Sequence, residues 1–221
     1  MSHYQFDLYL GGDTLKERIN QLKEEKLLPL YTATDLSLLK DAEEVLIKNN
    51  LNFIEVTYRS GLASEAIKYL ADSGKLIVGA GTVRNIQTAK NAIAHGARFI
   101  VTPGLCEEVL AFCQNENILC IPGAVTPSEI LLSMQYGVRT IKFFPANIYG
   151  GLRAIQALKE PFFDINFIPT GGINDQNMCE YLADEAVTAV GGSFIISEND
   201  LIKNGKAYST KKLERIVEKI N

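Results

Sequence analysis

The stretch NFIEVTYRSGLASEAIKYLADSGKLIVGAG, residues 52–81, holds one complete strand, helix and strand pattern. The runs NFIEVT at 52–57 and KLIVGAG at 75–81 are short, apolar and rich in β-branched residues, as buried strands are. Between them, LASEAIKYLA at 62–71 has the period of a helix. Its apolar residues on one helical face are Leu62, Ala66, Ile67 and Leu70. This is the repeating unit of a parallel α/β sheet.

The same unit repeats along the chain. Eight strand-like runs start about 20 to 26 residues apart, and amphipathic segments separate them. An open doubly wound sheet uses the same units and is the main alternative. Eight evenly spaced units favour closure, so we predict a single-domain (β/α)8 TIM barrel. The predicted strands are 28–33, 52–57, 75–81, 98–102, 118–123, 140–144, 166–170 and 187–192.

No linker rich in Gly, Ser or Pro divides the chain, which indicates one structural domain. We assign residues 28–221 to the barrel and residues 1–27 to an N-terminal leader that packs on it. The leader is polar and is predicted to be helical around Thr14 to Lys26.

The charge and apolar patterns exclude several classes of partner. The formal net charge is -4, and no Lys/Arg cluster is interleaved with aromatic residues, so we expect no nucleic-acid or membrane partner. No apolar run reaches about 18 residues, and the start MSHYQFDLYLGG lacks the features of a secretory signal, which predicts a cytoplasmic protein. The four cysteines form no CxxC pair and are predicted to be ordinary buried thiols rather than metal ligands.

A lysine interrupts the predicted strand TIKFFPA at 140–146. Strand alternation places Lys142 on the same side as Thr140 and Phe144, which in a closed barrel can be the interior. Burial disfavours a charged ammonium group and leaves a neutral amine that can attack a carbonyl carbon and form an imine. The alternative is a structural lysine that reaches the rim or pairs with a carboxylate.

A second polar residue interrupts NFIEVT in the same way. Glu55 shares its side of the strand with Phe53 and Thr57, and Arg59 follows just past the strand end. A carboxylate beside an amine can move protons while the amine forms the imine. The alternative is a plain buried ion pair between Glu55 and Lys142. Arg59 can offer its planar fork to a substrate carboxylate, or it can be a solvated surface group.

Glycine-rich turns follow most of the predicted strands. In a barrel they gather at the carboxyl-terminal mouth, where active sites lie. TGG at 170–172 and GGS at 191–193 follow the seventh and eighth strands, and glycines there let backbone N–H groups approach an anion. A helix beginning after them would add the positive end of its dipole. We therefore predict phosphate contacts at Gly171, Gly172, Gly192 and Ser193; tight turns alone are the alternative.

Seven motifs in order resemble those of the bacterial 2-keto-3-deoxy-6-phosphogluconate (KDPG) aldolases, also described as 4-hydroxy-2-oxoglutarate aldolases. The similarity runs from about Leu28 to the C-terminal helix. It implies a class I aldolase that acts on a small 2-keto sugar-acid phosphate, needs no metal or cofactor and is a homotrimer. The motifs are EVTYRS, GAGTV, TPG, IPG, KFFPA, PTGGI and GGSF.

The resemblance also implies a role for each matched residue. Lys142 corresponds to the imine-forming lysine and Glu55 to the proton acceptor, which acts through water. Arg59 and Thr82 are expected around the pyruvyl carboxylate. The walls of the pyruvyl pocket and the phosphate turns are expected at Pro103, Phe144, Thr170, Gly171, Gly172, Gly191, Gly192 and Ser193.

Departures from the family pattern, and two rival functions, bear on this interpretation. Asn147 stands where the family commonly has an acidic residue, and Tyr58 where an aliphatic residue is usual, which bears on substrate preference. One rival is another phosphate-binding barrel, an isomerase or synthase that relies on metal ligands or paired carboxylates. The only histidines, His3 and His95, lie beside no acidic cluster and argue against a His-rich metal site. The other rival is a non-catalytic sugar-phosphate sensor.

Overall fold

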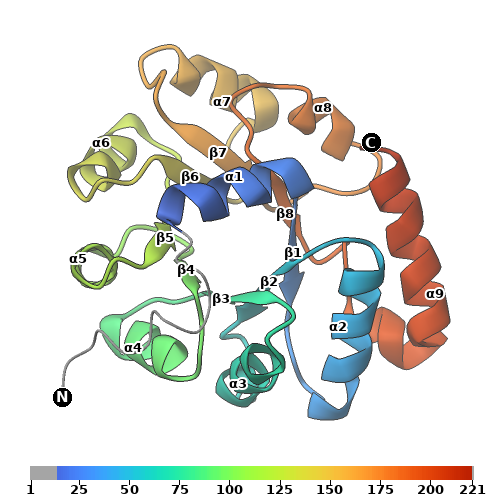
Figure 1. Cartoon of the computed structure of the whole chain (residues 1–221). Helices are drawn as coiled ribbons and strands as arrows, with labels where there is room; N and C mark the ends of the chain where they lie inside the picture. Colours follow the sequence, from blue (N-terminus) through green and yellow to red (C-terminus); the bar gives the residue numbers. More distant parts are fainter. Residues whose placement is uncertain (1–13, 221) are drawn as a thin grey trace.

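The computed structural model describes residues 14–220 and shows a ring of parallel strands surrounded by helices (Figure 1). All eight predicted strands are present, and each is shorter than the apolar run that predicted it. The strands are β1 (Leu27–Tyr31), β2 (Phe53–Thr57), β3 (Ile77–Gly81), β4 (Phe99–Val101), β5 (Leu119–Ile121), β6 (Thr140–Phe143), β7 (Asn166–Pro169) and β8 (Val190–Gly192).

The strands close into a barrel in chain order. Six of them form one parallel sheet in the order β5-β4-β3-β2-β1-β8, and β6 pairs with β7. Three parallel bridges complete the ring: Gly123 with Lys142 on one side, and Phe167 with Val187 and Thr170 with Gly191 on the other. An open doubly wound sheet would leave two unpaired edges, so the predicted (β/α)8 barrel is confirmed.

Helices follow the strands and cover the outside of the ring (Figure 1). The last and longest, α9, packs along α2 and so lies beside the first unit of the barrel. The helices after β1 are η2 (Leu36–Leu38), α2 (Leu39–Lys48), α3 (Ala63–Ser73), α4 (Ile86–Ala94), α5 (Glu107–Asn115), α6 (Pro127–Gln135), α7 (Gly151–Lys159), α8 (Met178–Leu182) and α9 (Glu198–Glu218).

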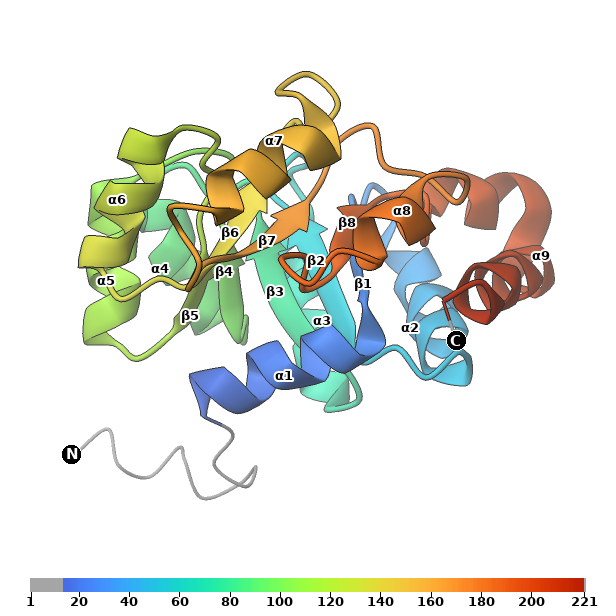
Figure 2. The ribbon, with the colours of Figure 1, turned by 90° about the horizontal axis from the view of Figure 1, so that it is seen from above.

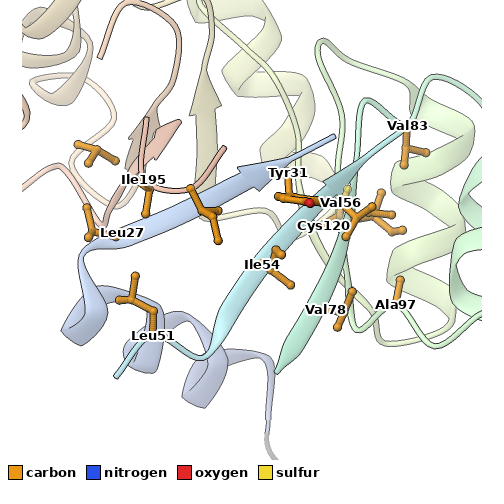
Figure 3. Packing of buried hydrophobic residues seen from close by; sticks show 14 of the residues in the cluster. Leu27, Tyr31, Leu51, Ile54, Val56, Val78, Val83, Ala97, Cys120 and Ile195 are labelled. Carbon is orange, nitrogen blue, oxygen red and sulfur yellow. The ribbon is translucent and has the colours of Figure 1, made fainter. Parts of the chain in front are cut away.

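Strand alternation divides the core into two layers. Ile54, Val56 and Val78 belong to the outer layer, between the strands and the helices (Figure 3). Phe53 of the same β2 strand belongs to the inner layer, where its ring lies 6.0 Å from that of Phe99. Each fully buried apolar side chain of these layers contributes roughly 1.5 to 3 kcal/mol to stability. The inner layer fills the end of the barrel at the amino-terminal ends of the strands. Polar residues that face the interior therefore lie nearer the carboxyl-terminal mouth.

Helix α1 (Leu15–Glu25) lies across the amino-terminal ends of the strands (Figure 2). Thr14 and Glu17 form a capping box at its start. The apolar face of α1, with Leu22 buried, packs on the inner core layer and closes that end of the barrel. The rest of the predicted leader, residues 1–13, lies outside the described residues.

The prediction that all four cysteines are buried was wrong. Cys113 and Cys120 are buried, but Cys106 is half-buried and Cys179 is exposed. Cys179 lies in the five-residue helix α8, and its thiol faces the C-terminal end of α9, where it reaches the carbonyl oxygen of Lys219. No helix in residues 14–220 is both long enough and apolar enough to cross a membrane.

Candidate active site

Lys142 and Glu55 meet inside the barrel. Nζ of Lys142 lies 3.3 Å from Oε1 of Glu55, and only 5% and 1% of the two side chains are exposed. Lys142 comes from β6 and Glu55 from β2, on strands that are not neighbours in the ring. The contact therefore spans the barrel interior, as alternation along each strand predicts.

The second carboxylate oxygen of Glu55 is unpaired in the described part of the chain. Oε2 is buried and has no hydrogen-bond partner within residues 14–220. A buried carboxylate oxygen without a partner loses the hydration it would have in water. Glu55 thus keeps one oxygen for Lys142 and one that is free to accept a proton or a hydrogen bond from a ligand.

Gly81 makes room for this carboxylate. A Cβ atom on Gly81 would overlap Oε1 of Glu55. Strand β3 pairs with β2, and a second glycine of β3, Gly79, is the register partner of Glu55. Gly81 was not among the predicted site residues. Its signal was present in GAGT, where glycine occupies an inward position of a strand that is otherwise apolar.

Phe144 lies beside the lysine, and Pro103 lies against a glycine that bridges to it. Nζ of Lys142 lies 5.4 Å from the centre of the Phe144 ring. Gly123, which bridges to Lys142, packs so tightly under Pro103 that a Cβ atom there would overlap the Pro103 carbonyl oxygen. The Phe144 ring therefore forms an apolar wall beside the amine, and the backbones of Gly123 and Pro103 pack closely next to the strand that carries it.

Arg59 and Thr82 also come together. Nε of Arg59 donates a hydrogen bond to Oγ1 of Thr82 at 3.2 Å, across the ends of β2 and β3. Thr82 has a left-handed backbone with φ of 58°, an uncommon conformation for a β-branched residue. The Arg59 side chain is exposed, so its guanidinium group is accessible to an anionic ligand.

The two glycine-rich turns lie side by side. Thr170 bridges to Gly191, and a Cβ atom on Gly191 would overlap the Thr170 hydroxyl oxygen. That hydroxyl, Oγ1, is buried and has no hydrogen-bond partner in the part of the chain that the structure describes. The turn after β7 and the turn after β8 therefore lie against each other at the barrel mouth.

Gly171 and Gly172 have φ angles of 89° and 76°, which L side chains rarely adopt. The side chain of Asn147, one of the residues that depart from the family pattern, lies against Gly172. The Asn147 backbone N–H donates to the Gly171 carbonyl at 3.2 Å. Gly192 packs against the Phe194 ring, while Ser193 is exposed.

The expected helix dipoles are displaced from these glycines. Helix α8 begins only at Met178, and α9 only at Glu198. Between Gly172 and α8, the side chain of Asn177 donates to the Gly172 carbonyl at 3.0 Å and closes a turn. Any anion at these turns would therefore meet backbone groups of the turns rather than helix ends.

The comparison with protein families agrees with this geometry. The family model described as KDPG and KHG aldolase matches residues 19–213. The chain belongs to this family. Among relatives, the 2-dehydro-3-deoxy-phosphogluconate aldolase of Dickeya dadantii (strain 3937) is 40% identical over 79% of this chain and 83% of its own. The KHG/KDPG aldolase of Escherichia coli (strain K12) is 37% identical over 86% and 89% of the two chains.

The solved structures show the same aldolase fold. The crystal structure of KDPG aldolase from Legionella pneumophila has a TM-score of 0.86 and 30% identity to this aldolase, and it covers 92% of this chain and 98% of its own. That crystal structure holds pyruvate captured at low pH as a covalent carbinolamine intermediate.

Proposed function

We propose that this aldolase cleaves KDPG to pyruvate and glyceraldehyde 3-phosphate through an imine on Lys142. The observation that carries the proposal is the buried contact between Nζ of Lys142 and the Glu55 carboxylate at 3.3 Å. A carbinolamine, such as the one in the Legionella relative, forms when an amine adds to a ketone. Lys142 supplies a buried amine at the mouth end of β6, beside a group that can move protons.

The contact with Glu55 also gives the lysine a way to become nucleophilic. Transfer of one proton from the Lys142 ammonium to the Glu55 carboxylate leaves a neutral amine and a neutral acid. The amine adds to the C2 ketone, and the acid returns its proton to the carbinolamine oxygen, which leaves as water. The products of this step are a protonated imine and the Glu55 carboxylate.

Carbon–carbon cleavage follows from that state. The Glu55 carboxylate takes the C4 hydroxyl proton, directly or through a water molecule, as the C3–C4 bond breaks and its electrons move into the imine. Glyceraldehyde 3-phosphate leaves, and an enamine of pyruvate remains on Lys142. Glu55 then protonates C3, and water hydrolyses the imine to release pyruvate. The imine is the electron sink, so the proposed chemistry requires no metal or organic cofactor, and general acid–base assistance contributes about 10² to 10⁴ in rate.

The remaining site residues bind the two ends of the substrate in this proposal. Arg59 and Thr82 hold the carboxylate, and Phe144 and Pro103 enclose the methylene carbon. The phosphate is bound by the two adjacent turns, Thr170–Gly172 and Gly191–Ser193. Because the carboxylate and the ketone are shared, 4-hydroxy-2-oxoglutarate is a second substrate, cleaved to pyruvate and glyoxylate without the phosphate contacts.

We propose further that the enzyme is a cytoplasmic homotrimer, in which residues 1–27 serve as a leader on the barrel at 28–221. Support for assembly comes from large apolar side chains that are more than half exposed, including Leu131, Ile148 and Phe163. Light scattering after size-exclusion chromatography gives the oligomeric state directly, and a monomer at micromolar concentration would contradict it.

Reductive trapping tests the proposed nucleophile. Incubation with pyruvate and borohydride is expected to add one pyruvate-derived group, and peptide mapping should place it on Lys142. Lys68→Met, which changes an exposed lysine whose ion-pair partner, Asp72, is also exposed, serves as the control and should label normally. Lys142→Met should take up no label and cleave no KDPG. Label on another lysine would assign a different nucleophile, and KDPG binding without cleavage by the unmodified protein would favour the sensor.

A further inference from the structure

A cavity outside the barrel mouth is lined mainly by residues of the second half of α9, together with Asp175 of the loop before α8. Figure 1 shows that α9 ends beside α8. The volume of the cavity is about 420 Å³. Four of its lining side chains are cationic and one is a carboxylate, which leaves three positive charges in a protein whose formal net charge is -4. The charged lining residues are Lys211, Lys212, Arg215, Lys219 and Asp175.

The cations form one stripe along α9. Residues three and four apart lie on the same face of a helix, so Lys211 and Arg215 are neighbours, as are Arg215 and Lys219. Like charges at this spacing repel and destabilise a helix. A bound anion removes that repulsion, because it places negative charge between the cations.

Acidic groups of the protein neutralise only part of the stripe. Lys212 pairs with Asp200 at 2.7 Å, and Lys219 pairs with Asp175 at 3.0 Å. Within residues 14–220, no acidic group lies within ion-pair distance of Lys211 or Arg215. Two cations of the cavity therefore have free donors for a ligand.

We propose that this cavity binds the phosphate group of a small phosphorylated metabolite. The guanidinium of Arg215 offers a planar pair of donors that matches phosphate oxygens, and the ammonium of Lys211 adds charge one turn away. Phe194 and Ile216 give the cavity an apolar side, and the Tyr208 hydroxyl is a further hydrogen-bonding group at its edge. The ligand thus has an anionic head and an uncharged body that contacts the Phe194 ring.

Asp175 competes with such a ligand for Lys219. The hydrogen bond from the Lys219 ammonium holds the pKa of Asp175 below its usual range, so this carboxylate is ionised at neutral pH. Asp175 lies in the loop between Gly172 and α8, and Phe194 follows Ser193 directly. The cavity therefore adjoins both turns at the mouth from the outer side of the barrel.

Trace acylation tests binding at these lysines without measuring turnover. The native protein is treated with a small amount of acetic anhydride, in inorganic phosphate or in chloride of equal ionic strength, and acetylation is mapped by peptide mass spectrometry. Phosphate should protect Lys211 and Lys219, whereas Lys203, exposed on the first part of α9, should react equally in both salts. Equal protection of all three lysines, or of none, overturns the proposal.

Two substitutions should move phosphate affinity in opposite directions. Arg215→Gln should raise the phosphate concentration that gives half-maximal protection about tenfold, because it removes a charge-assisted hydrogen bond. Asp175→Asn should lower that phosphate concentration about twofold to fivefold, because it removes the competing carboxylate. Lys203→Gln is the matched control on the same helix and should change nothing. An unchanged midpoint in Arg215→Gln would rule out the site, and that failure leaves the aldolase proposal intact.

Discussion

Nζ of Lys142 and Oε1 of Glu55 lie 3.3 Å apart in the barrel interior, on strands β6 and β2. A buried ion pair of this kind contributes little more stability than two well-packed apolar residues would. Its presence is therefore better explained by chemistry than by folding. Removing either partner leaves the other as an unpaired buried charge, and the resulting loss of stability can be measured.

Removal of the amine should reduce stability as well as activity. Lys142→Met leaves the fully buried Glu55 carboxylate without its partner, which costs about 3 to 5 kcal/mol. Urea unfolding at pH 8 measures this loss. The double variant Lys142→Met/Glu55→Gln should be more stable than Lys142→Met alone, because no buried charge remains. A double variant that is less stable than the single one would contradict this account of the pair.

Gly81→Ala should impair catalysis through Glu55. The added methyl group would overlap Oε1 of Glu55 and push the carboxylate away from Lys142. A displacement of about 1 Å can lower the rate about 10²-fold, and overpacking destabilises by about 1 to 3 kcal/mol. Steady-state cleavage of KDPG gives kcat. Gly61→Ala is the control, since a Cβ atom on Gly61 would meet no other atom within 4 Å, and it should keep normal kcat.

Arg59→Lys should weaken binding of both substrates. Lysine keeps the charge but loses the planar fork and cannot reproduce the Nε contact with Thr82. We expect KM to rise about tenfold for KDPG and for 4-hydroxy-2-oxoglutarate alike, because both carry the same carboxylate. The same change at Arg84, an exposed neighbour, is the control. A KM effect on only one substrate would assign Arg59 to a different part of the ligand.

Ser193→Ala should separate the two substrates. Ser193 is exposed in the turn after β8, where its hydroxyl can donate to a phosphate oxygen. We expect KM for KDPG to rise about threefold to tenfold and KM for the unphosphorylated diacid to stay the same. The unphosphorylated substrate is thus an internal control for folding. Equal changes for both substrates would place the phosphate elsewhere.

The barrel was predictable because its signals are local. Each strand of a parallel barrel is buried on both faces, so its sequence is an apolar run, as in β2. Each helix has apolar residues at helical spacing on its buried face, as in α3. The two helix dipoles expected beside the turns after β7 and β8 were misplaced, since periodicity does not show the turn between Gly172 and α8, where the Asn177 side chain donates to the Gly172 carbonyl. The exposure of Cys179 likewise follows from how α8 sits beside α9.

The sequence by itself determined which side of each strand Lys142 and Glu55 occupy, because alternation fixes side-chain direction within a strand. Only the tertiary structure decided that these side chains touch, since the distance between β6 and β2 depends on how the ring closes. The role of Gly81 emerged in the same way, because the space that glycine leaves acquires meaning only when another strand's carboxylate fills it. The basic stripe of α9 is visible in the chain, but its cavity exists only where α9 meets the loop that carries Asp175.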